Sequence, residues 1–183
     1  ELRGREKPDE VVVISGHLDS WDLGQGAQDD GSGCVAAMDA IRVLRKLGLR
    51  PRRTIRVVLW TNEENGLGGA RQYVKDHADE MGKHVAAIEM DHGCFKPRGY
   101  SIDHKDKAAL DRMTQRLRGL LAPLEIKPGG SAADIGQMKD AGVPLLGFEV
   151  ENSRYFDYHH THADTMDKVD PKELAECVAV MAA

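Results

Sequence analysis

Residues 11–33 read VVVISGHLDSWDLGQGAQDDGSG and join a strand signal to a polar, glycine-rich loop. The first four residues form a short apolar, β-branched run, which is typical of a buried strand. The loop that follows carries residues 17–30, and a pattern with helical spacing then runs over residues 32–47 and stops at Gly48. This stretch therefore predicts a strand, a functional loop and a helix in succession.

The same alternation of strand and helix continues along the chain. Short apolar runs predict strands at 11–14, 55–60, 85–90 and 143–150. Apolar spacing and capping signals predict helices at 32–47, 68 to about 79, 106–121, 132–141 and 171–183. Such alternation predicts one α/β domain over residues 1–183, a three-layer α/β/α sandwich with a mostly parallel mixed sheet.

The composition excludes several classes of protein. The chain has 183 residues, is 41% hydrophobic and carries a net charge of -5. Its Lys and Arg residues are scattered without a basic stripe, which argues against nucleic acid as a partner. No apolar run reaches the roughly 18 residues of a membrane span. The first residues show no signal peptide, and the compartment stays open. Three widely spaced cysteines are expected to be buried thiols: Cys34, Cys94 and Cys177.

Potential metal ligands follow the predicted strands. His17 comes after the first strand, Glu63 and Glu64 after the second, and Asp91 after the third. In α/β folds the carboxyl ends of the strands hold the site, so these residues are expected to meet. Glu89 would share a face with Asp91, and we choose Asp91 because it is nearer the strand end. Histidine and carboxylate ligands with one free glutamate suit a two-metal hydrolase.

Two motifs contain adjacent carboxylates that can divide their work. Asp29 and Asp30 precede a glycine-rich turn, where one can cap a helix and the other can bridge two cations. We assign the bridge to Asp29 and a supporting role to Asp30. The second pair is Glu63 and Glu64, in which one glutamate can bind metal while the other accepts a proton from water. Asp19 stands two residues after His17 and can accept the imidazole N–H that does not face the metal.

The last motif holds three histidines in four residues. His159, His160 and His162 are crowded, and their spacing does not distinguish the metal ligand. Upstream, residues 129–131 read GGS before a predicted helix, whose N-terminus could hold a substrate carboxylate. Ser131 and Asp134 are the candidates there, with a simple helix cap by Ser131 as the alternative.

Together these motifs resemble the M28 family of zinc metallopeptidases, over residues 11 to about 180. The stretches 17–30, HLDSWDLGQGAQDD, and 155–166, YFDYHHTHADTM, resemble its carboxypeptidase Q branch. The resemblance implies two zinc ions, for which manganese or cobalt could substitute. It implies a peptide or dipeptide substrate, and a secreted or periplasmic location would fit the family. The implied ligands are His17 and Asp91 on one ion, Glu64 and His160 on the other, with Asp29 bridging, Glu63 as general base and Asp19 orienting His17. A cis peptide between Asp29 and Asp30 is also implied.

The sequence departs from the family pattern in two respects. Many relatives have Tyr directly before the last histidine ligand, where this chain has His159, so Tyr158 and His159 are the candidate oxyanion donors. Relatives also carry a longer N-terminal region and sometimes an inserted domain, so an excised catalytic domain is expected. The rival functions are a single-zinc, glutaminyl-cyclase-like aminoacyltransferase and a catalytically idle metal-binding or interaction domain.

Overall fold

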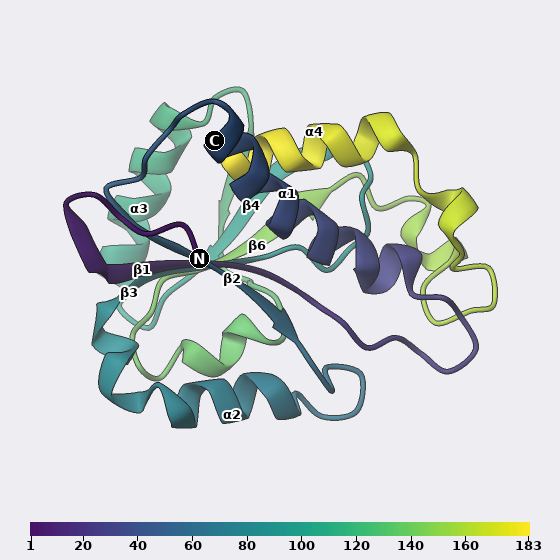
Figure 1. Ribbon diagram of the computed structural model, residues 1–183, viewed down its shortest axis with the longest axis horizontal. Helices are drawn as coiled ribbons and strands as arrows, with labels where there is room; N and C mark the ends of the chain where they lie inside the picture. The colour runs from purple at the N-terminus through teal and green to yellow at the C-terminus, as the bar shows by residue number, and fades with distance from the viewer.

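A six-stranded sheet forms the centre of the protein. The computed structural model describes all residues 1–183 (Figure 1). The strand order is β2-β1-β3-β6-β4-β5. All neighbouring strands are parallel except β4 and β6. The strands are β1 (Lys7–His17), β2 (Arg53–Trp60), β3 (His84–Glu89), β4 (Pro97–Asp103), β5 (Glu125–Pro128) and β6 (Leu145–Val150).

Helices cover both faces of this sheet, which confirms the predicted three-layer sandwich. The α-helices are α1 (Ser32–Lys46), α2 (Gly68–Asp76), α3 (Lys107–Leu120) and α4 (Pro171–Ala182). One face packs against α1, α3 and α4, with Phe95 and Phe148 at its core. The opposite face packs against α2, with Trp60 and Ala70 buried there (Figure 1). No helix has the length and apolar character that a membrane span requires.

Three predictions about the elements are wrong. The sequence did not predict β4 or β5, because β4 begins with Pro97 and contains Gly99 among polar residues, and β5 has only four residues. The helix predicted at 132–141 is instead a short 3-10 turn, Ile135–Met138. It follows Gly129 and Gly130, both with positive φ, and Gly142, also with positive φ, ends the segment. The segment therefore lacks the length for an α-helix.

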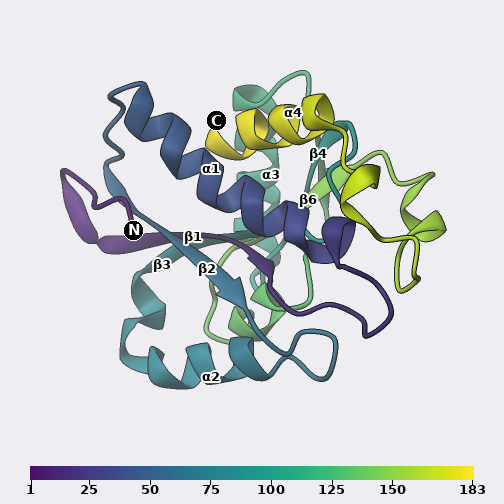
Figure 2. The same cartoon turned by 45° about the vertical axis from the view of Figure 1, so that its right-hand side comes forward.

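The topology brings the polar loops together at one edge of the sheet. The strands β2, β1, β3 and β6 are neighbours and run parallel, so their carboxyl ends meet. His17 is the last residue of β1, and the loop after β6 carries His159, His160 and His162. The loops before α1 and before α4 lie side by side at this edge (Figures 1 and 2). The fold thus assembles segments that are far apart in the sequence.

Candidate metal centre

A pocket of about 380 Å³ opens at the carboxyl ends of these strands. It contains four carboxylates and three histidines, and no Lys or Arg lines it. The lining residues are Asp29, Glu63, Glu64, Asp91, His92, Tyr155, Phe156, His159 and His160. Such a concentration of carboxylates without basic side chains calls for positive charge from another source.

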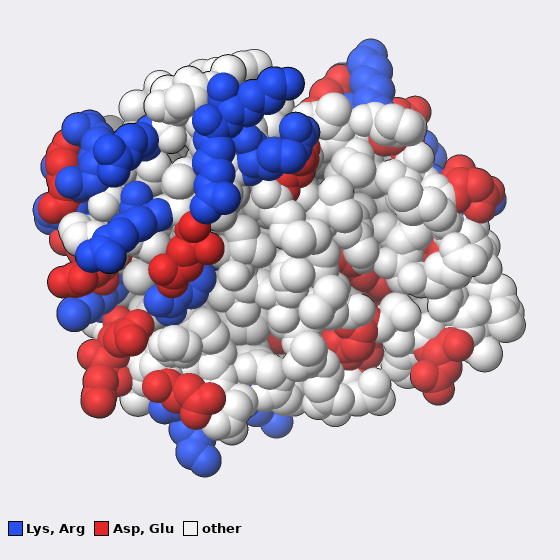
Figure 3. Space-filling view, in the orientation of Figure 1, with Lys and Arg blue, Asp and Glu red and all other residues white.

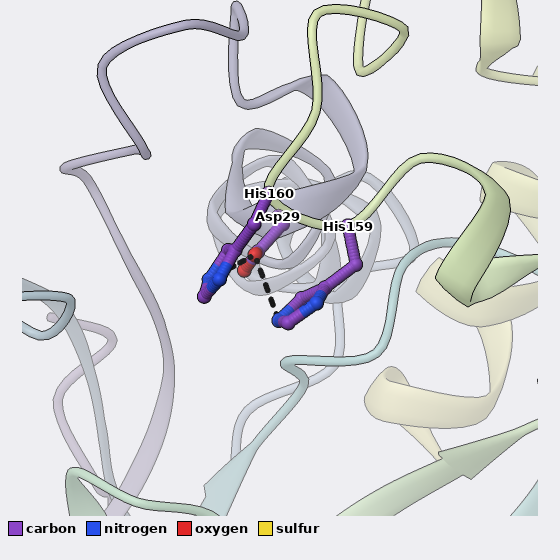
Figure 4. A group of neighbouring side chains, drawn as sticks. All are labelled: Asp29, His159 and His160. Atoms are coloured by element: carbon purple, nitrogen blue, oxygen red, sulfur yellow. Dashed lines mark ion pairs between the residues drawn. The ribbon is translucent and has the colours of Figure 1, made fainter.

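Asp29 lies at the centre of the cluster and is 4% exposed. Its Oδ1 lies 3.2 Å from His17 Nε2, and its Oδ2 lies 3.3 Å from His160 Nε2. His159 Nε2 lies farther from Oδ2, at 3.6 Å (Figure 4). The two oxygens of one carboxylate therefore face two different histidines.

His17 and His160 each also contact a second carboxylate. His17 Nε2 lies 3.1 Å from Asp91 Oδ1, and His160 Nε2 lies 2.9 Å from Glu64 Oε2. The result is two groups of ligand atoms, one on each side of Asp29. Potential metal-binding groups in this region include His17 with Asp29 and Asp91, and Asp29 with His159 and His160.

The donor atoms fit metal ions. Asp29 Oδ2 and Glu64 Oε1 are buried without a hydrogen-bond partner, which is costly unless a cation approaches them. Imidazole nitrogen and carboxylate oxygen are the mixed ligands that zinc accepts. Burial, followed by the charge of Asp29, raises the pKa of Glu64. A bound cation would relieve that repulsion.

A comparison with known proteins now places the chain in a family. The family model described as "Peptidase family M28" matches residues 1–183. The chain belongs to peptidase family M28. Carboxypeptidase Q from Mus musculus is 42% identical over 100% of this chain and 39% of its own length. A crystal structure of a peptidase M28 precursor from Shewanella amazonensis is 37% identical, with a TM-score of 0.88, over 99% of this chain and 41% of that one.

A solved structure of lower identity shows the same fold. The zinc aminopeptidase BSAP from Bacillus subtilis has a TM-score of 0.72 at 20% identity, covering 94% of this chain and 45% of that one. The chain spans about two-fifths of the length of the carboxypeptidase Q relatives that it matches.

Asp19 contacts this M28 site in a way that the sequence did not predict. His17 Nδ1 lies 2.9 Å from the backbone oxygen of Asp19, not from its carboxylate. The carboxylate instead accepts the backbone N–H groups of Glu63 and Glu64, at 3.0 and 3.3 Å. The chain turns back after His17, so the carbonyl reaches the ring while the side chain points to the loop after β2.

Glu63 lines the pocket without a hydrogen bond or ion pair to His17 or His160, and it also forms a possible metal-binding group with His17 and Glu64, whose ligand atoms lie within 4.8 Å of one another. Burial, followed by the nearby Asp91 carboxylate, raises its pKa to about 7. A carboxylate with such a pKa can accept and return a proton near neutral pH. Its position agrees with the proposed division of work between the adjacent glutamates.

Asp30 supports the site from behind. It is 1% exposed, and its two oxygens accept the N–H groups of His17 and Gly33, both at 2.9 Å. The peptide between Asp29 and Asp30 is cis, as the resemblance implies. The supporting role expected for Asp30 is therefore structural, through backbone contacts to β1 and α1.

The positions of the other histidines and of Tyr158 separate the candidates that the sequence left open. His160 contacts both Asp29 and Glu64, whereas His162 is exposed and belongs to none of the clusters. His159 lines the pocket. Tyr158 does not line it, because its ring packs beside Phe95 in the core. Of the two candidate oxyanion donors, only His159 faces the pocket.

Ser131 and Asp134 do not form a substrate-carboxylate site. No α-helix begins there, and Asp134 is fully buried. Burial raises the pKa of Asp134 to about 6, and burial with the neighbouring Asp134 raises the pKa of Glu89. Glu89 also accepts the N–H of Ile135 at 2.9 Å. Glu89 therefore fixes this turn to the end of β3 and is not aimed at the pocket.

Two residues with contacts at the site were missed by sequence reasoning. Tyr155 lines the pocket and donates its hydroxyl to the backbone oxygen of Asp91 at 3.3 Å. Asp164 is 3% exposed and accepts two backbone N–H groups beside the central carboxylate. Both belong to the quoted stretch 155–166, so their motif was visible although their partners were not.

Proposed function

We propose that this M28 chain is the catalytic domain of an exopeptidase that uses two zinc ions and cleaves peptides at chain ends or in dipeptides. One observation carries the proposal. The two oxygens of Asp29 face separate histidine–carboxylate pairs, while Glu63 lines the same pocket without a hydrogen bond or ion pair to either histidine. A bridging carboxylate and an unbound glutamate are what two-metal hydrolysis requires.

The residues divide into holding and reacting groups. His17 and Asp91 would hold one ion, Glu64 and His160 the other, and Asp29 both. When bound, the ions would polarise the scissile carbonyl and lower the pKa of water. Glu63 would accept the proton of the attacking water on its carboxylate and return it to the leaving amine. Asp19 supports this step because its carboxylate holds the backbone of Glu63.

His159 is the side chain we assign to the developing oxyanion. Its Nε2 lies 3.6 Å from Asp29 Oδ2, at the wall of the pocket. Burial lowers the pKa of His159, so the ring is neutral near pH 7 and offers a single N–H. That N–H can stabilise negative charge on the carbonyl oxygen.

The test is the substitution Glu63→Gln, which keeps the size of the side chain and removes its basicity. We expect turnover of aminoacyl anilides and dipeptides to fall by about 10²–10⁴-fold, the usual contribution of a general base. Zinc content should stay at the wild-type value, because Glu63 holds no ion. Activity and bound zinc are measured on the same preparation, and Glu125→Gln on the exposed strand β5 is the control.

Three results would contradict the proposal. Undiminished turnover in Glu63→Gln would remove the general base from the account. Aminoacyl cyclisation without peptide hydrolysis, with one zinc per chain, would favour the single-zinc aminoacyltransferase. No turnover of any peptide by the zinc-loaded wild-type chain would favour an idle binding domain.

A further inference from the structure

Two loops that carry metal-ligand candidates are joined by a set of hydrogen bonds. The loop before α1 carries Asp29, and the loop after β6 carries His160. Their backbones meet where the N–H of Gln25 donates to the backbone oxygen of Asp164 at 2.8 Å. The side-chain oxygen of Gln25 accepts the N–H of Met166 at 3.2 Å. Both loops contribute polar groups, so their relative position depends on these bonds.

Asp164 makes the central contact of this junction. Its Oδ1 accepts the N–H of Gln28 at 2.7 Å, and its Oδ2 accepts the N–H of Asp29 at 3.0 Å. The carboxylate is 3% exposed, and bonds from ionised groups to backbone N–H are stronger than neutral ones. One buried side chain thus fixes two successive peptide groups at the bridging residue.

Gln28 extends the junction to two more segments. Its side chain is fully buried. The amide nitrogen donates to the backbone oxygen of Lys168 at 2.9 Å, and the amide oxygen accepts the N–H of Cys94 at 2.8 Å. The peptide next to Asp29 is therefore held from both the loop after β6 and the loop after β3.

The turn that contains Asp164 also contains His160. Thr161 donates its hydroxyl to the backbone oxygen of Tyr158 at 2.8 Å and accepts the N–H of Ala163 at 3.1 Å. The N–H of Asp164 donates to the backbone oxygen of Thr161 at 3.2 Å. Because this turn is closed by its own hydrogen bonds, His160 and Asp164 are expected to move together.

The other half of the site depends on different contacts. His17 ends β1 and Asp91 follows β3, and these strands are paired, with Ser15 opposite Glu89. Asp30 holds Asp29 near His17 by accepting the N–H of His17. Loss of the Asp164 contacts would therefore separate Asp29 from His160 more than from His17.

We propose that Asp164 is a positioning residue that sets the distance between Asp29 and His160 and so determines the affinity of the second metal position. The proposal rests on the proposed function, because it assumes that Asp29 bridges two ions. It assigns Asp164 a role through Asp29, without contact to substrate or metal. Supporting contacts to metal ligands typically contribute about 10–100-fold in metal affinity.

The experiment compares Asp164→Asn with Asp167→Asn. Asparagine keeps the shape of Asp164 but offers an NH₂ group to one backbone N–H, so one of the two bonds is lost. Asp167 lies in the same loop, its side chain is 69% exposed, and it contacts only Lys168 and Thr165. Zinc affinity is measured by competition with a chelator, and amide hydrogen exchange is followed at Gln28 and Asp29 in the zinc-free protein.

We expect wild type and Asp167→Asn to bind two zinc ions alike. Asp164→Asn should bind the second zinc about 10–100-fold more weakly, keep the first within about threefold, and exchange the Gln28 and Asp29 amides faster. Gln25→Ala, an exposed change that removes one junction bond, should weaken the second zinc in the same direction but less. This variant keeps the test open if Asp164→Asn does not fold.

The outcomes separate this inference from the proposed function. If Asp164→Asn binds both zinc ions with the wild-type affinities and its amide exchange is unchanged, the positioning role is overturned. If both zinc ions bind equally more weakly in Asp164→Asn and Gln25→Ala, the role is also overturned, since the geometry requires a larger loss of affinity at the second metal position than at the first. A wild-type chain that binds one zinc overturns the proposed function instead, and the amide exchange then reports on the Asp164 contacts alone.

Discussion

Asp19 acts on the site through two different groups. Its backbone oxygen accepts the imidazole N–H of His17, while its carboxylate accepts the N–H groups of Glu63 and Glu64. The first contact fixes which nitrogen of His17 faces the metal position. The second fixes the loop that carries Glu63, the proposed general base. A substitution of the side chain removes only the second contact.

The variant Asp19→Ala should therefore reduce turnover while leaving the metal position at His17 intact. We expect kcat to fall by about tenfold or more, a typical loss for a supporting contact. The affinity for the first zinc should be unchanged, because the backbone oxygen of Asp19 remains. Steady-state kinetics and chelator competition test this, with the exposed neighbour Asp22→Ala as control. A large loss of first-zinc affinity with unchanged kcat would show that the carboxylate orients His17.

Zinc binding should release protons near neutral pH. Burial acts to lower the pKa of His17, but hydrogen bonds to Asp29 and Asp91 outweigh burial and raise that pKa well above its usual value. The metal-free ring is therefore protonated at pH 7 and must lose its proton to bind zinc. Because a raised pKa keeps the proton in place, zinc affinity should fall as the pH is lowered, about tenfold per pH unit for each proton released.

Calorimetry measures this proton release directly. Zinc titrations at pH 7 in buffers of different ionisation enthalpy should give different apparent heats. Identical heats in all buffers would mean that His17 is already neutral in the metal-free protein.

The sequence identified residue types more securely than their contacts. His17, Glu63, Glu64 and Asp91 could be placed near one another because they follow neighbouring strands. The choice among His159, His160 and His162 required either family resemblance or the structure, because all three are chemically equivalent ligands. The roles of the Asp164 and Asp19 carboxylates depend on backbone N–H partners that lie 136 and 44 residues away, which no local pattern reveals.

At the scale of elements, the close approach of α1 to β1 and β3 positions Asp30 and its neighbour Asp29, the proposed bridging ligand. Gly33 lies in the first turn of α1, where an added Cβ would overlap the backbone oxygen of Met90 and the Asp30 carboxylate. Gly33 also donates its N–H to Asp30 at 2.9 Å. The helix can lie this close only because the residue has no side chain.

Gly33→Ala should consequently destabilise the protein, whereas Gly119→Ala should not. We expect a loss of about 1–3 kcal/mol in the free energy of unfolding for Gly33→Ala, as for overpacked cores. Gly119 lies exposed in α3 with nothing within 4 Å of the added Cβ, so alanine should stabilise by about 0.5–1 kcal/mol. Urea unfolding of the metal-free variants measures both. A stable Gly33→Ala variant would mean that α1 can move away from β3 without cost.

The elements that could be predicted are those with an apolar run or a regular helical pattern. The four strands predicted from apolar runs and the helices α1, α2, α3 and α4 lie within a few residues of their predicted positions. Strands β4 and β5 are the last two in the sheet order, and their only buried large apolar residues are Tyr100, Ile102 and Ile126. Their apolar signal is therefore too weak to separate them from loops.

At the scale of the whole molecule, charge is distributed unevenly. Lys and Arg gather over the C-terminal end of α1 and the start of β2, at the upper left of Figure 3. Residues 42–53 contain six basic side chains and no acidic one: Arg42, Arg45, Lys46, Arg50, Arg52 and Arg53. The expectation of scattered basic residues is wrong in this respect, because the turn after α1 brings them to one end. The pocket lies at the opposite end of α1 and carries carboxylates, which favours the approach of cations.

The central claim is that Asp29 bridges two metal ions in one pocket. The most direct measurement is the number of zinc ions bound per metal-free chain at saturation, determined by elemental analysis for wild type and Asp29→Ala. We expect two ions for wild type and at most one for Asp29→Ala, because the variant lacks the shared ligand. One ion in wild type, or two ions retained in Asp29→Ala, would contradict it.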